Sequence, residues 1–337
     1  EGYDRTSMKL PQCQDRLIEE VLKVQPNVVV VLHNGSPVEL PWADKVSAIL
    51  EMYLGGQGVG EACDRLLYGE ANPSGRLAET FPYRLEDNPS YLHFPGNGKR
   101  VLYGEDIFVG YRYYDTKKVP VRYAFGHGLS YTEFAYEDLN LSSAQMTDED
   151  ILTVSFKVKN TGKTEGKEVV QLYVADMCGI SERPVKELKG FAKVHLLPGE
   201  EKTVSMEISA RDLSYYEERL GDWYAPSGTY RILIGHASDD VRLHADIIFE
   251  TQKELPLRVD FTTTFGELLD HTKTAPVITE LLAPLAAAAA SAEGMSDEYK
   301  KLGEQVIREM PMKSLLGQMP GEQVEQLIGQ LNCLLAQ

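Results

Sequence analysis

The sequence contains few cysteines and no long apolar run, and both features limit what the protein can be. Its four cysteines are scattered over 337 residues without a CxxC pair. They are Cys13, Cys63, Cys178 and Cys333. This spacing favours isolated reduced thiols over disulfides or a zinc site, and we therefore expect a bacterial cytoplasmic protein. No apolar stretch approaches the roughly 20 residues that span a bilayer, and no secretory leader is recognisable, so no membrane partner is expected.

Basic residues are also scarce, since 34 Lys and Arg stand against 51 Asp and Glu, a net charge of −17. A nucleic-acid partner is not expected, because binding to phosphates requires a basic face. An uncharged small-molecule substrate would be compatible with this charge. The apolar fraction of 43% and the charged fraction of 25% are ordinary for globular proteins, and the length suggests two or three domains.

The sequence also lacks the usual motifs for metal or cofactor binding. His33, His93, His127 and His236 form no HxH or HxxxH pair, so a metal site is not expected. The glycine-rich run GGQGVG at residues 55–60 has the wrong spacing for a dinucleotide fingerprint, and no acidic residue follows at the required distance. We predict no cofactor, and interpret the glycines as a turn where backbones pack closely.

Residues 12–82 alternate between helical and strand patterns. A helix is predicted over residues 12–24, where apolar residues recur at helical spacing. The short run VVVVL at residues 28–32 predicts a strand buried on both faces and hence part of a parallel sheet. A second apolar run, AILEMYL, leads into the glycine turn and another helix. These strands are too few for a complete open sheet, so the missing ones are expected to precede Glu1.

The pattern changes to a period of two over residues 134–251. The clearest alternation comprises Leu152, Val154, Phe156 and Val158. Similar alternations follow, separated by turn sequences such as NTG, LPGEE and APSG. About seven short strands of this kind predict a β-sandwich of the immunoglobulin or fibronectin type III style.

The remaining residues, 252–337, have helical patterns, and the last segment carries one apolar stripe. The stripe comprises Val324, Leu327, Ile328, Leu331 and Leu335. The predicted architecture is therefore multidomain α/β plus all-β. It consists of a partial α/β sandwich with a mainly parallel sheet and its connector (residues 1–133), the β-sandwich (134–251) and a helical C-terminal extension (252–337).

The segment YGEDIFVGYRYYD combines Glu105, Asp106 and Arg112 with several tyrosines. Aromatic rings beside carboxylates could line a sugar site. Alternatively, the segment is a structural crossover in which the tyrosine rings are buried and their hydroxyls are hydrogen-bonded across a domain boundary. We favour the crossover interpretation.

Several motifs together resemble glycoside hydrolase family 3, and most closely its β-glucosidases. They are VVVVLHNGSPVELPW, GGQGVGEACDRLLYGEANPSGRLAETFP, YGEDIFVGYRYYD and YAFGHGLSYTEF. The β-region, with EVVQLYVAD, RPVKELKGFAKVHLLPGEEKTV and PSGTYRILIG, is similar to the fibronectin type III-like domain of that family. The resemblance covers residues 1–250 in collinear order, and the tail resembles a helical extension of some bacterial members.

The resemblance implies a retaining mechanism with an aspartate nucleophile on an N-terminal (β/α)8 barrel and a glutamate acid/base on the α/β sandwich. The acid/base loop of the family resembles SGEGYDR, which makes Glu1 the acid/base candidate here. Asp4 and Arg5 are expected to form an ion pair that holds this loop. No aspartate of the chain matches the nucleophile motif, and the α-amino group beside the Glu1 carboxyl would favour its ionised form. We therefore expect a catalytically incomplete chain.

The predicted function is that of the C-terminal portion of a β-glucosidase acting on terminal β-linked glucose. The expected partners are a β-glucoside or oligosaccharide substrate and the missing barrel half. Assembly into a homo-oligomer is also compatible with the sequence. Alternatives are a non-catalytic carbohydrate-binding or scaffolding module, or a β-xylosidase of the same family. Trp42 and Trp223 are expected to be packing residues, which speaks against a carbohydrate-binding platform.

Overall fold

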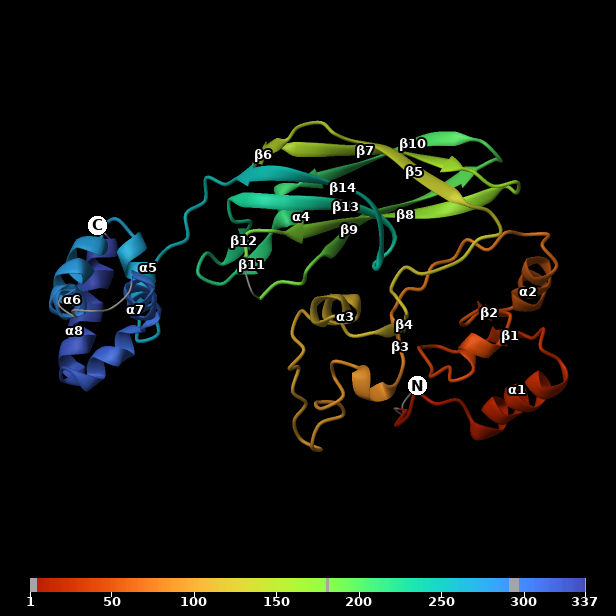
Figure 1. The fold of residues 1–337 in the computed structure, drawn as a ribbon, viewed down its shortest axis with the longest axis horizontal. Coiled ribbons are helices and arrows are strands. Elements are labelled where there is room, and N and C mark those ends of the chain that lie inside the picture. The colour runs from red at the N-terminus through yellow and green to blue at the C-terminus, as the bar shows by residue number, and fades with distance from the viewer. Residues whose placement is uncertain (1–4, 180–181, 291–296, 337) are drawn as a thin grey trace. The chain divides into compact units, whose positions relative to one another are not determined.

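The computed structural model describes residues 5–179, 182–290 and 297–336, and Glu1 and Asp4 lie outside the described residues. The chain forms two compact units, Glu1–Lys253 and Glu254–Gln337 (Figure 1). The first contains the α/β region, its connector and the β-sandwich, and the second contains the C-terminal helices.

The α/β region begins the first unit. In chain order it contains α1 (Gln12–Val24), β1 (Val29–Leu32), η1 (Ala43–Lys45), β2 (Ala48–Glu51) and α2 (Val59–Leu67). Strands β1 and β2 pair in parallel, with Val29 opposite Ala48. The predicted parallel strand is therefore confirmed. The core around it contains Val30, Leu32, Trp42 and Phe81.

The prediction that this strand is buried on both faces is wrong at Val29, whose side chain is 47% exposed, whereas Val30 and Leu32 are buried. Within the described residues, β1 has β2 as its sole strand partner. Val29 remains exposed because no described element packs against its side chain on the face of β1 opposite Val30 and Leu32. A strand buried on both faces requires a layer on each side of the sheet.

A connector leads from the α/β region to the sandwich. It contains β3 (Phe81–Pro82), η2 (Leu85–Asp87), α3 (Tyr111–Lys117) and β4 (Val121–Tyr123). Strand β4 pairs antiparallel with β3, so the residues between them form an excursion that begins and ends at this strand pair. Lys118 follows the last residue of α3 and adopts the left-handed conformation common after helix C-termini.

The β-sandwich consists of a three-stranded and a five-stranded sheet. The first has the order β10 (Glu201–Ser209), β7 (Ile151–Asn160), β5 (Phe134–Leu141). The second has the order β6 (Gln145–Thr147), β14 (Asp240–Glu250), β13 (Gly228–Ala237), β8 (Gly166–Asp176), β9 (Glu187–Leu196). Strand β6 pairs in parallel with β14, and the other pairs are antiparallel. The predicted fibronectin type III-like sandwich is confirmed.

Strands β7 and β8 show how the sandwich is covered. Buried residues alternate with more exposed ones along β7, as its period of two predicts, and the buried face meets the opposite sheet. The second half of β8 is buried on both faces, because the connector packs on its outer side. The Tyr173 ring there makes an edge contact with the Tyr111 ring of α3, at 5.9 Å between centroids.

A short helix and a hairpin close one end of the sandwich: α4 (Ala210–Leu213), β11 (Tyr215–Glu217) and β12 (Asp222–Tyr224). Ser209 and Asp212 form a capping box at the start of α4. Trp42 is fully buried, as expected of a packing residue. Trp223 is 37% exposed, and the Arg211 guanidinium lies over its ring.

The second unit is helical and has a core of its own. It contains α5 (Phe265–Asp270), α6 (Ala275–Ala290), α7 (Asp297–Glu309), η3 (Met312–Gly317) and α8 (Gly321–Leu335). The predicted stripe of α8 faces this core, with Val324 and Leu331 fully buried. Asn332 fixes the segment that precedes α5. Its side-chain oxygen accepts a hydrogen bond from the Val259 backbone N–H, and its side-chain nitrogen donates one to the Val259 carbonyl oxygen. None of the helices within the described ranges has the length and apolar composition for a membrane crossing.

Candidate functional site

A hollow of about 660 Å³ lies in the first unit, where the N-terminal segment meets the carboxyl ends of the strands and the connector. Its lining includes Arg5, Thr6, Ser7, Met8, Ser36, Pro37, Glu79, Thr80, Pro82, Leu85, Asn88, Pro89, Ser90, Tyr91, Phe94, Pro95, Glu105, Val109, Gly110 and Tyr114. Segments far apart in the sequence therefore form one concave surface. In open α/β sheets, ligand sites lie outside the carboxyl ends of the parallel strands, as this hollow does.

Arg5 ties the N-terminal segment to the loop that follows β1. Its guanidinium donates hydrogen bonds to the Ser36 hydroxyl and, at 3.3 Å, to the Pro37 carbonyl oxygen. The Asn34 side-chain amide supports this loop by donating to the Ser36 carbonyl oxygen at 2.9 Å. The predicted partner of Arg5, Asp4, lies outside the described residues, and so does the acid/base candidate Glu1.

Two half-buried carboxyl groups lie near the ends of the strands. Burial raises the pKa of Glu79, although the Arg5 charge opposes this shift and the Glu51 charge adds to it. Burial also raises the pKa of Glu51, which accepts a 2.8 Å hydrogen bond from the Tyr53 backbone N–H. These environments favour the protonated acids more than water does, and such perturbed carboxyls are common at functional sites.

Tyr53 completes this acidic group and has an unusual backbone. Its φ of 46° lies in the left-handed region, which a residue of this size rarely adopts. Burial raises the pKa of Tyr53 to about 12, and the charges of Glu79 and Glu51 contribute. The Tyr53 hydroxyl is buried without a hydrogen-bond partner. Local strain and an unsatisfied polar group of this kind are typical of functional sites rather than of a plain core.

The connector contributes an aromatic and partly apolar wall. Tyr114 is buried at the base, whereas Tyr91 and Phe94 are about half exposed. Two buried oxygens in this lining have no hydrogen-bond partner, Thr80 Oγ1 and Glu105 Oε2. The wall can therefore accept an apolar surface while its polar atoms remain available for donors on whatever fills the hollow.

The crossover interpretation of YGEDIFVGYRYYD holds for part of the segment. The Tyr111 hydroxyl accepts a 2.7 Å hydrogen bond from the Leu188 backbone N–H, and Arg112 pairs with Glu187 at 3.1 Å. Both partners belong to β9, so this half joins the connector to the sandwich. Tyr103, in contrast, is 80% exposed. The prediction of a buried tyrosine is wrong there, because residue 103 lies in an extended loop before α3 that no described element covers.

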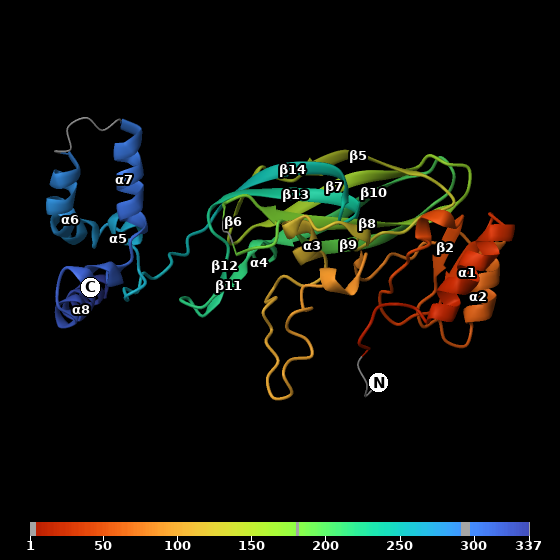
Figure 2. The same ribbon diagram turned by 60° about the horizontal axis from the view of Figure 1, so that its bottom comes forward.

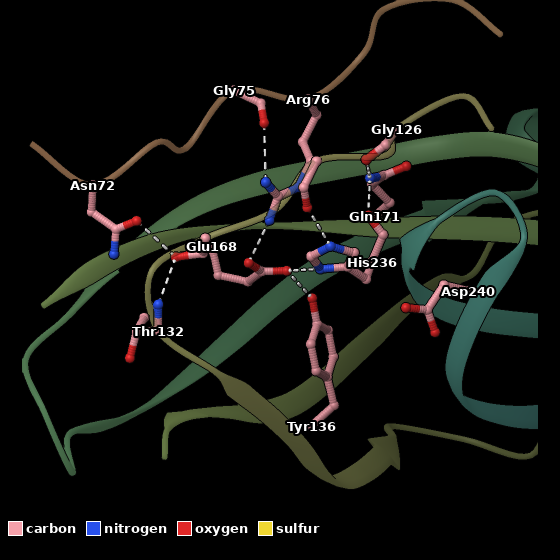
Figure 3. A network of polar contacts seen from close by, with 12 residues as sticks. Asn72, Gly75, Arg76, Gly126, Thr132, Tyr136, Glu168, Gln171, His236 and Asp240 are labelled. Atoms are coloured by element: carbon pink, nitrogen blue, oxygen red, sulfur yellow. Dashed lines mark hydrogen bonds and ion pairs between the residues drawn. The ribbon is translucent and has the colours of Figure 1, made fainter. Parts of the chain in front are cut away.

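A buried ionic network fixes the sandwich against the connector (Figure 3). The Glu168 carboxylate, on β8, is fully buried and pairs with Arg76 at 2.6 Å. The Tyr136 hydroxyl donates to the same carboxylate at 2.6 Å, and His236 Nδ1 lies 2.6 Å from it. The other ring nitrogen of His236 lies 2.8 Å from the Gly128 carbonyl oxygen, so both ring nitrogens face acceptors. A charge buried in this way is tolerated because donors surround it.

Gln171 extends this network along β8. Its amide donates to the carbonyl oxygens of Gly126 and His236, and its own oxygen accepts from the Tyr173 hydroxyl. Gly126 has a φ of 82°, and a Cβ there would lie 2.2 Å from the Gln171 side chain. The connector can therefore approach the strand this closely only with glycine at position 126.

The sequence patterns did not reveal Glu51, Glu79 or Glu168 as important residues. The Glu168 pairs join positions 92, 32 and 68 residues apart, and no local periodicity reports such distances. One available signal was a glutamate inside an otherwise apolar strand, EVVQLYV. Among the described residues, no group of His, Cys, Asp or Glu is arranged to hold a metal ion.

Comparisons with known sequences give a consistent result. The description "Glycosyl hydrolase family 3 C-terminal domain" fits residues 1–131, and "Fibronectin type III-like domain" fits residues 168–238. The chain is 46% identical over 336 residues to the thermostable beta-glucosidase B of Acetivibrio thermocellus, covering 98% of this chain and 44% of that protein. It is also 46% identical over 257 residues to a beta-glucosidase of Kluyveromyces marxianus, covering 76% of this chain and 30% of that protein.

Solved structures agree with the sequence comparisons. A family 3 beta-glucosidase of Bifidobacterium adolescentis aligns with a TM-score of 0.75 at 38% identity, over 82% of this chain and 41% of that one. The Kluyveromyces marxianus beta-glucosidase in complex with glucose aligns with a TM-score of 0.70 at 43% identity, over 74% and 30%. The chain thus spans less than half the length of these relatives.

Proposed function

Because the chain belongs to glycoside hydrolase family 3 and corresponds to the C-terminal part of its β-glucosidases, we propose that it contributes one side of the active site of a retaining β-glucosidase. The substrate class is a β-glucoside or oligosaccharide with a terminal β-linked glucose. Glucose is the sugar we infer because the relatives compared above are named beta-glucosidases. The observation that carries the proposal is the position of Arg5. It belongs to the EGYDR motif and is hydrogen-bonded to the loop that follows β1.

In this proposal Glu1 is the general acid/base. A retaining glycosidase needs two carboxyl groups about 5–5.5 Å apart, one as nucleophile and one that protonates the leaving oxygen and later activates water. The Arg5 hydrogen bonds to the loop after β1 would limit the motion of the segment that carries Glu1. The hollow beside Arg5 provides space on the leaving-group side, with aromatic rings from the connector.

The nucleophile is proposed to lie on further chain that precedes the matched region in the longer relatives. The chain covers 44% of the Acetivibrio thermocellus protein, and the unmatched remainder of that protein supports this view. We propose that the 337-residue chain is inactive by itself, because no aspartate in it matches the family's nucleophile motif.

The test is the hydrolysis of an aryl β-glucoside by two proteins, each with and without Glu1→Gln. The first is the 337-residue chain, and the second is a chimera that places the preceding part of the Acetivibrio thermocellus enzyme before Glu1. We expect no turnover from the chain alone and turnover from the chimera that Glu1→Gln reduces by about 10²-fold or more, since general acid–base catalysis contributes about 10²–10⁴-fold.

Azide distinguishes an acid/base from a merely structural glutamate. Azide is already an anion, so it attacks a glycosyl-enzyme intermediate without a general base and forms a β-glucosyl azide. Added azide should therefore restore turnover of an activated aryl glucoside in the Glu1→Gln chimera. Turnover by the chain alone, or a Glu1→Gln chimera as active as its parent, would contradict the proposal.

A further inference from the structure

The imidazole ring of His236, on β13, lies between two hydrogen-bond acceptors. Its Nδ1 is 2.6 Å from the Glu168 carboxylate, and its Nε2 is 2.8 Å from the Gly128 carbonyl oxygen (Figure 3). Both distances are short enough for hydrogen bonds. A neutral imidazole has one N–H group and one lone pair, whereas an imidazolium has two N–H groups. Only the imidazolium form of His236 can therefore donate to both acceptors.

The two acceptors belong to different parts of the first unit. Glu168 lies on β8, the neighbour of β13 in the five-stranded sheet (Figure 2). Gly128 belongs to residues 124–133, which lead from β4 into β5 and which we call the junction segment. The protonated His236 ring therefore joins the junction segment to the sandwich.

The surroundings of the ring favour a positive charge on it. The charged and titratable groups there are Glu168 of β8, Tyr136 of β5, Arg76 of the segment before β3, His127 and Glu133 of the junction segment, Asp239 of the turn before β14, and Asp240 and Arg242 of β14. Arg76 pairs with Glu168, and Arg242 pairs with Asp240, each at 2.6 Å. Two arginines thus face four carboxylates, and an anionic surrounding stabilises an imidazolium.

The second histidine of this region, His127, has the opposite tendency. Burial lowers the pKa of His127, the Asp239 charge opposes this shift, and the positive charges of His236 and Arg76 add to it. His127 is therefore the histidine that becomes neutral first as the pH rises. A change of the hydrogen bonds above neutral pH belongs to His236.

Solvent protons can reach the His236 ring, although its partner Glu168 is fully buried. The side chain of His236 is 18% exposed. It lines a hollow of about 420 Å³ together with Gly128, Tyr136 and Arg242. A proton that leaves the ring can pass to water in this hollow.

A neutral His236 ring loses one of its two hydrogen bonds. If the remaining proton is on Nε2, the buried Glu168 carboxylate loses a donor and a positive neighbour. If it is on Nδ1, the Gly128 carbonyl oxygen loses its donor. The first loss is the more costly, because a buried charge depends on the donors around it. Gly128 is therefore the acceptor that a neutral ring releases.

We propose that His236 is a pH-operated latch between the junction segment and the sandwich. With two protons the ring holds Gly128 to Glu168, and when it gives one proton to solvent the junction segment loosens. A histidine that gains an anionic partner on folding stabilises the fold at acidic pH, and this stabilisation is lost as the pH rises. The inference goes beyond the proposed function and does not depend on it, because the ring and both acceptors lie within the described residues.

The ¹⁵N chemical shifts of the His236 ring in the 337-residue chain test the proton count directly. Both nitrogens should have the shift of a protonated nitrogen at pH 6. Toward pH 9, Nε2 should move to the shift of an unprotonated nitrogen while Nδ1 keeps its proton. An unprotonated ring nitrogen at pH 6, or two protonated nitrogens up to pH 10, overturns the proposal. Loss of the Nδ1 proton in place of the Nε2 proton also overturns it, because Gly128 then stays bound.

Amide hydrogen exchange tests whether the junction segment loosens. The Leu77 N–H donates to the His127 carbonyl oxygen at 2.9 Å, and the Ser238 N–H donates to the Phe125 carbonyl oxygen at 2.9 Å. The protection factors of Leu77 and Ser238, which correct for the intrinsic effect of pH, should fall by about tenfold or more between pH 6 and pH 9. Those of the β7 amides should stay constant. Constant protection at Leu77 and Ser238 overturns the proposal.

A variant without a titratable ring separates the latch from a general effect of pH. In His236→Gln the junction segment should have the same low protection at pH 6 and pH 9. The matched control is His244→Gln, at an exposed position of β14 in the same sheet, which should keep the pH-dependent step. A step that persists in His236→Gln contradicts the proposal. If His236→Gln does not fold, the nitrogen shifts and the exchange of the wild-type chain decide.

Discussion

The β-sandwich and the α/β region differ in how much of their apolar surface they cover themselves. In the sandwich, the alternating residues of β7 meet the opposite sheet, and the connector covers the outer face of β8. In the α/β region, α1 and α2 are fully described, and neither contains a buried residue. Both regions carry well-formed local patterns. The difference shows that an amphipathic pattern gives a stable core only where the chain also provides the surface that faces it.

The largest effect should come from the sandwich core. Phe156 is 1% exposed and lies between the sheets, so Phe156→Ala should lower the free energy of unfolding by about 3–5 kcal/mol. Urea denaturation of the 337-residue chain measures this change. Ile151→Ala, at a 62% exposed position of the same strand, is the control and should cost much less. Equal losses in the two variants would mean that β7 is not a core strand.

The next effect should come from the buried carboxylate that joins the regions. Glu168→Gln leaves the Arg76 guanidinium, which is 6% exposed, without its counter-charge. Removing one partner of a buried ion pair costs about 3 kcal/mol or more, and the thermal midpoint should fall accordingly. The exposed Glu165→Gln is the matched control. If both variants have the same thermal midpoint as the wild type, the network does not hold the connector to the sandwich.

A smaller and pH-dependent effect is expected at Glu217 in the β11–β12 hairpin. The Arg219 side chain donates two hydrogen bonds to this carboxylate and lowers its pKa to about 2. Because the folded pKa lies below the unfolded value of about 4.3, this stabilisation is present above that pH and is lost as the pH falls toward 2.

The variant Glu217→Gln should therefore have a free energy of unfolding about 1–2 kcal/mol below that of the wild type at pH 6–7. This difference should shrink between pH 4.5 and 2. Calorimetry across this pH range measures the difference. The exposed neighbour Glu218→Gln should show no such trend. A difference for Glu217→Gln that is constant with pH would rule out the carboxylate charge as its cause.

The smallest effect should come from the exposed face of α1. Leu17 on α1 is 64% exposed, so Leu17→Ala should change the free energy of unfolding by less than about 0.5 kcal/mol. Val30→Ala, on the buried face of the adjacent β1, should cost more and serves as the comparison. In the chimera, a large loss from Leu17→Ala would show that further chain covers α1.

The elements themselves were predictable from local patterns. The parallel strand, the strands with a period of two and the stripe of α8 follow from residue periodicity, and the structure contains all of them. The exposure of Val29 was not predictable, because the pattern indicates what a strand could bury and not whether a second layer is present. The double burial of β8 depends in the same way on the connector, which no pattern within β8 reports.

The site was less predictable than the fold. The motif around Arg5 was visible in the sequence, and its partner Ser36 belongs to another of the quoted motifs, but the two are 31 residues apart and nothing in either motif indicates that they are in contact. The raised pKa values of Glu51 and Glu79 arise from burial beside the strand ends, which depends on the register of β1 and β2. Tertiary contacts of this kind follow from the arrangement of the strands and not from the residues of one segment.

The central claim is that the β-sandwich covers its own apolar faces, whereas the α/β region, as we propose, is one side of a structure that includes further polypeptide. Hydrogen exchange resolved along the 337-residue chain tests this claim directly, because protection reports local stability. The account predicts that the amides of β7, β8 and β13 exchange at least a hundredfold more slowly than those of β1 and β2. Equal protection in the two regions would contradict it.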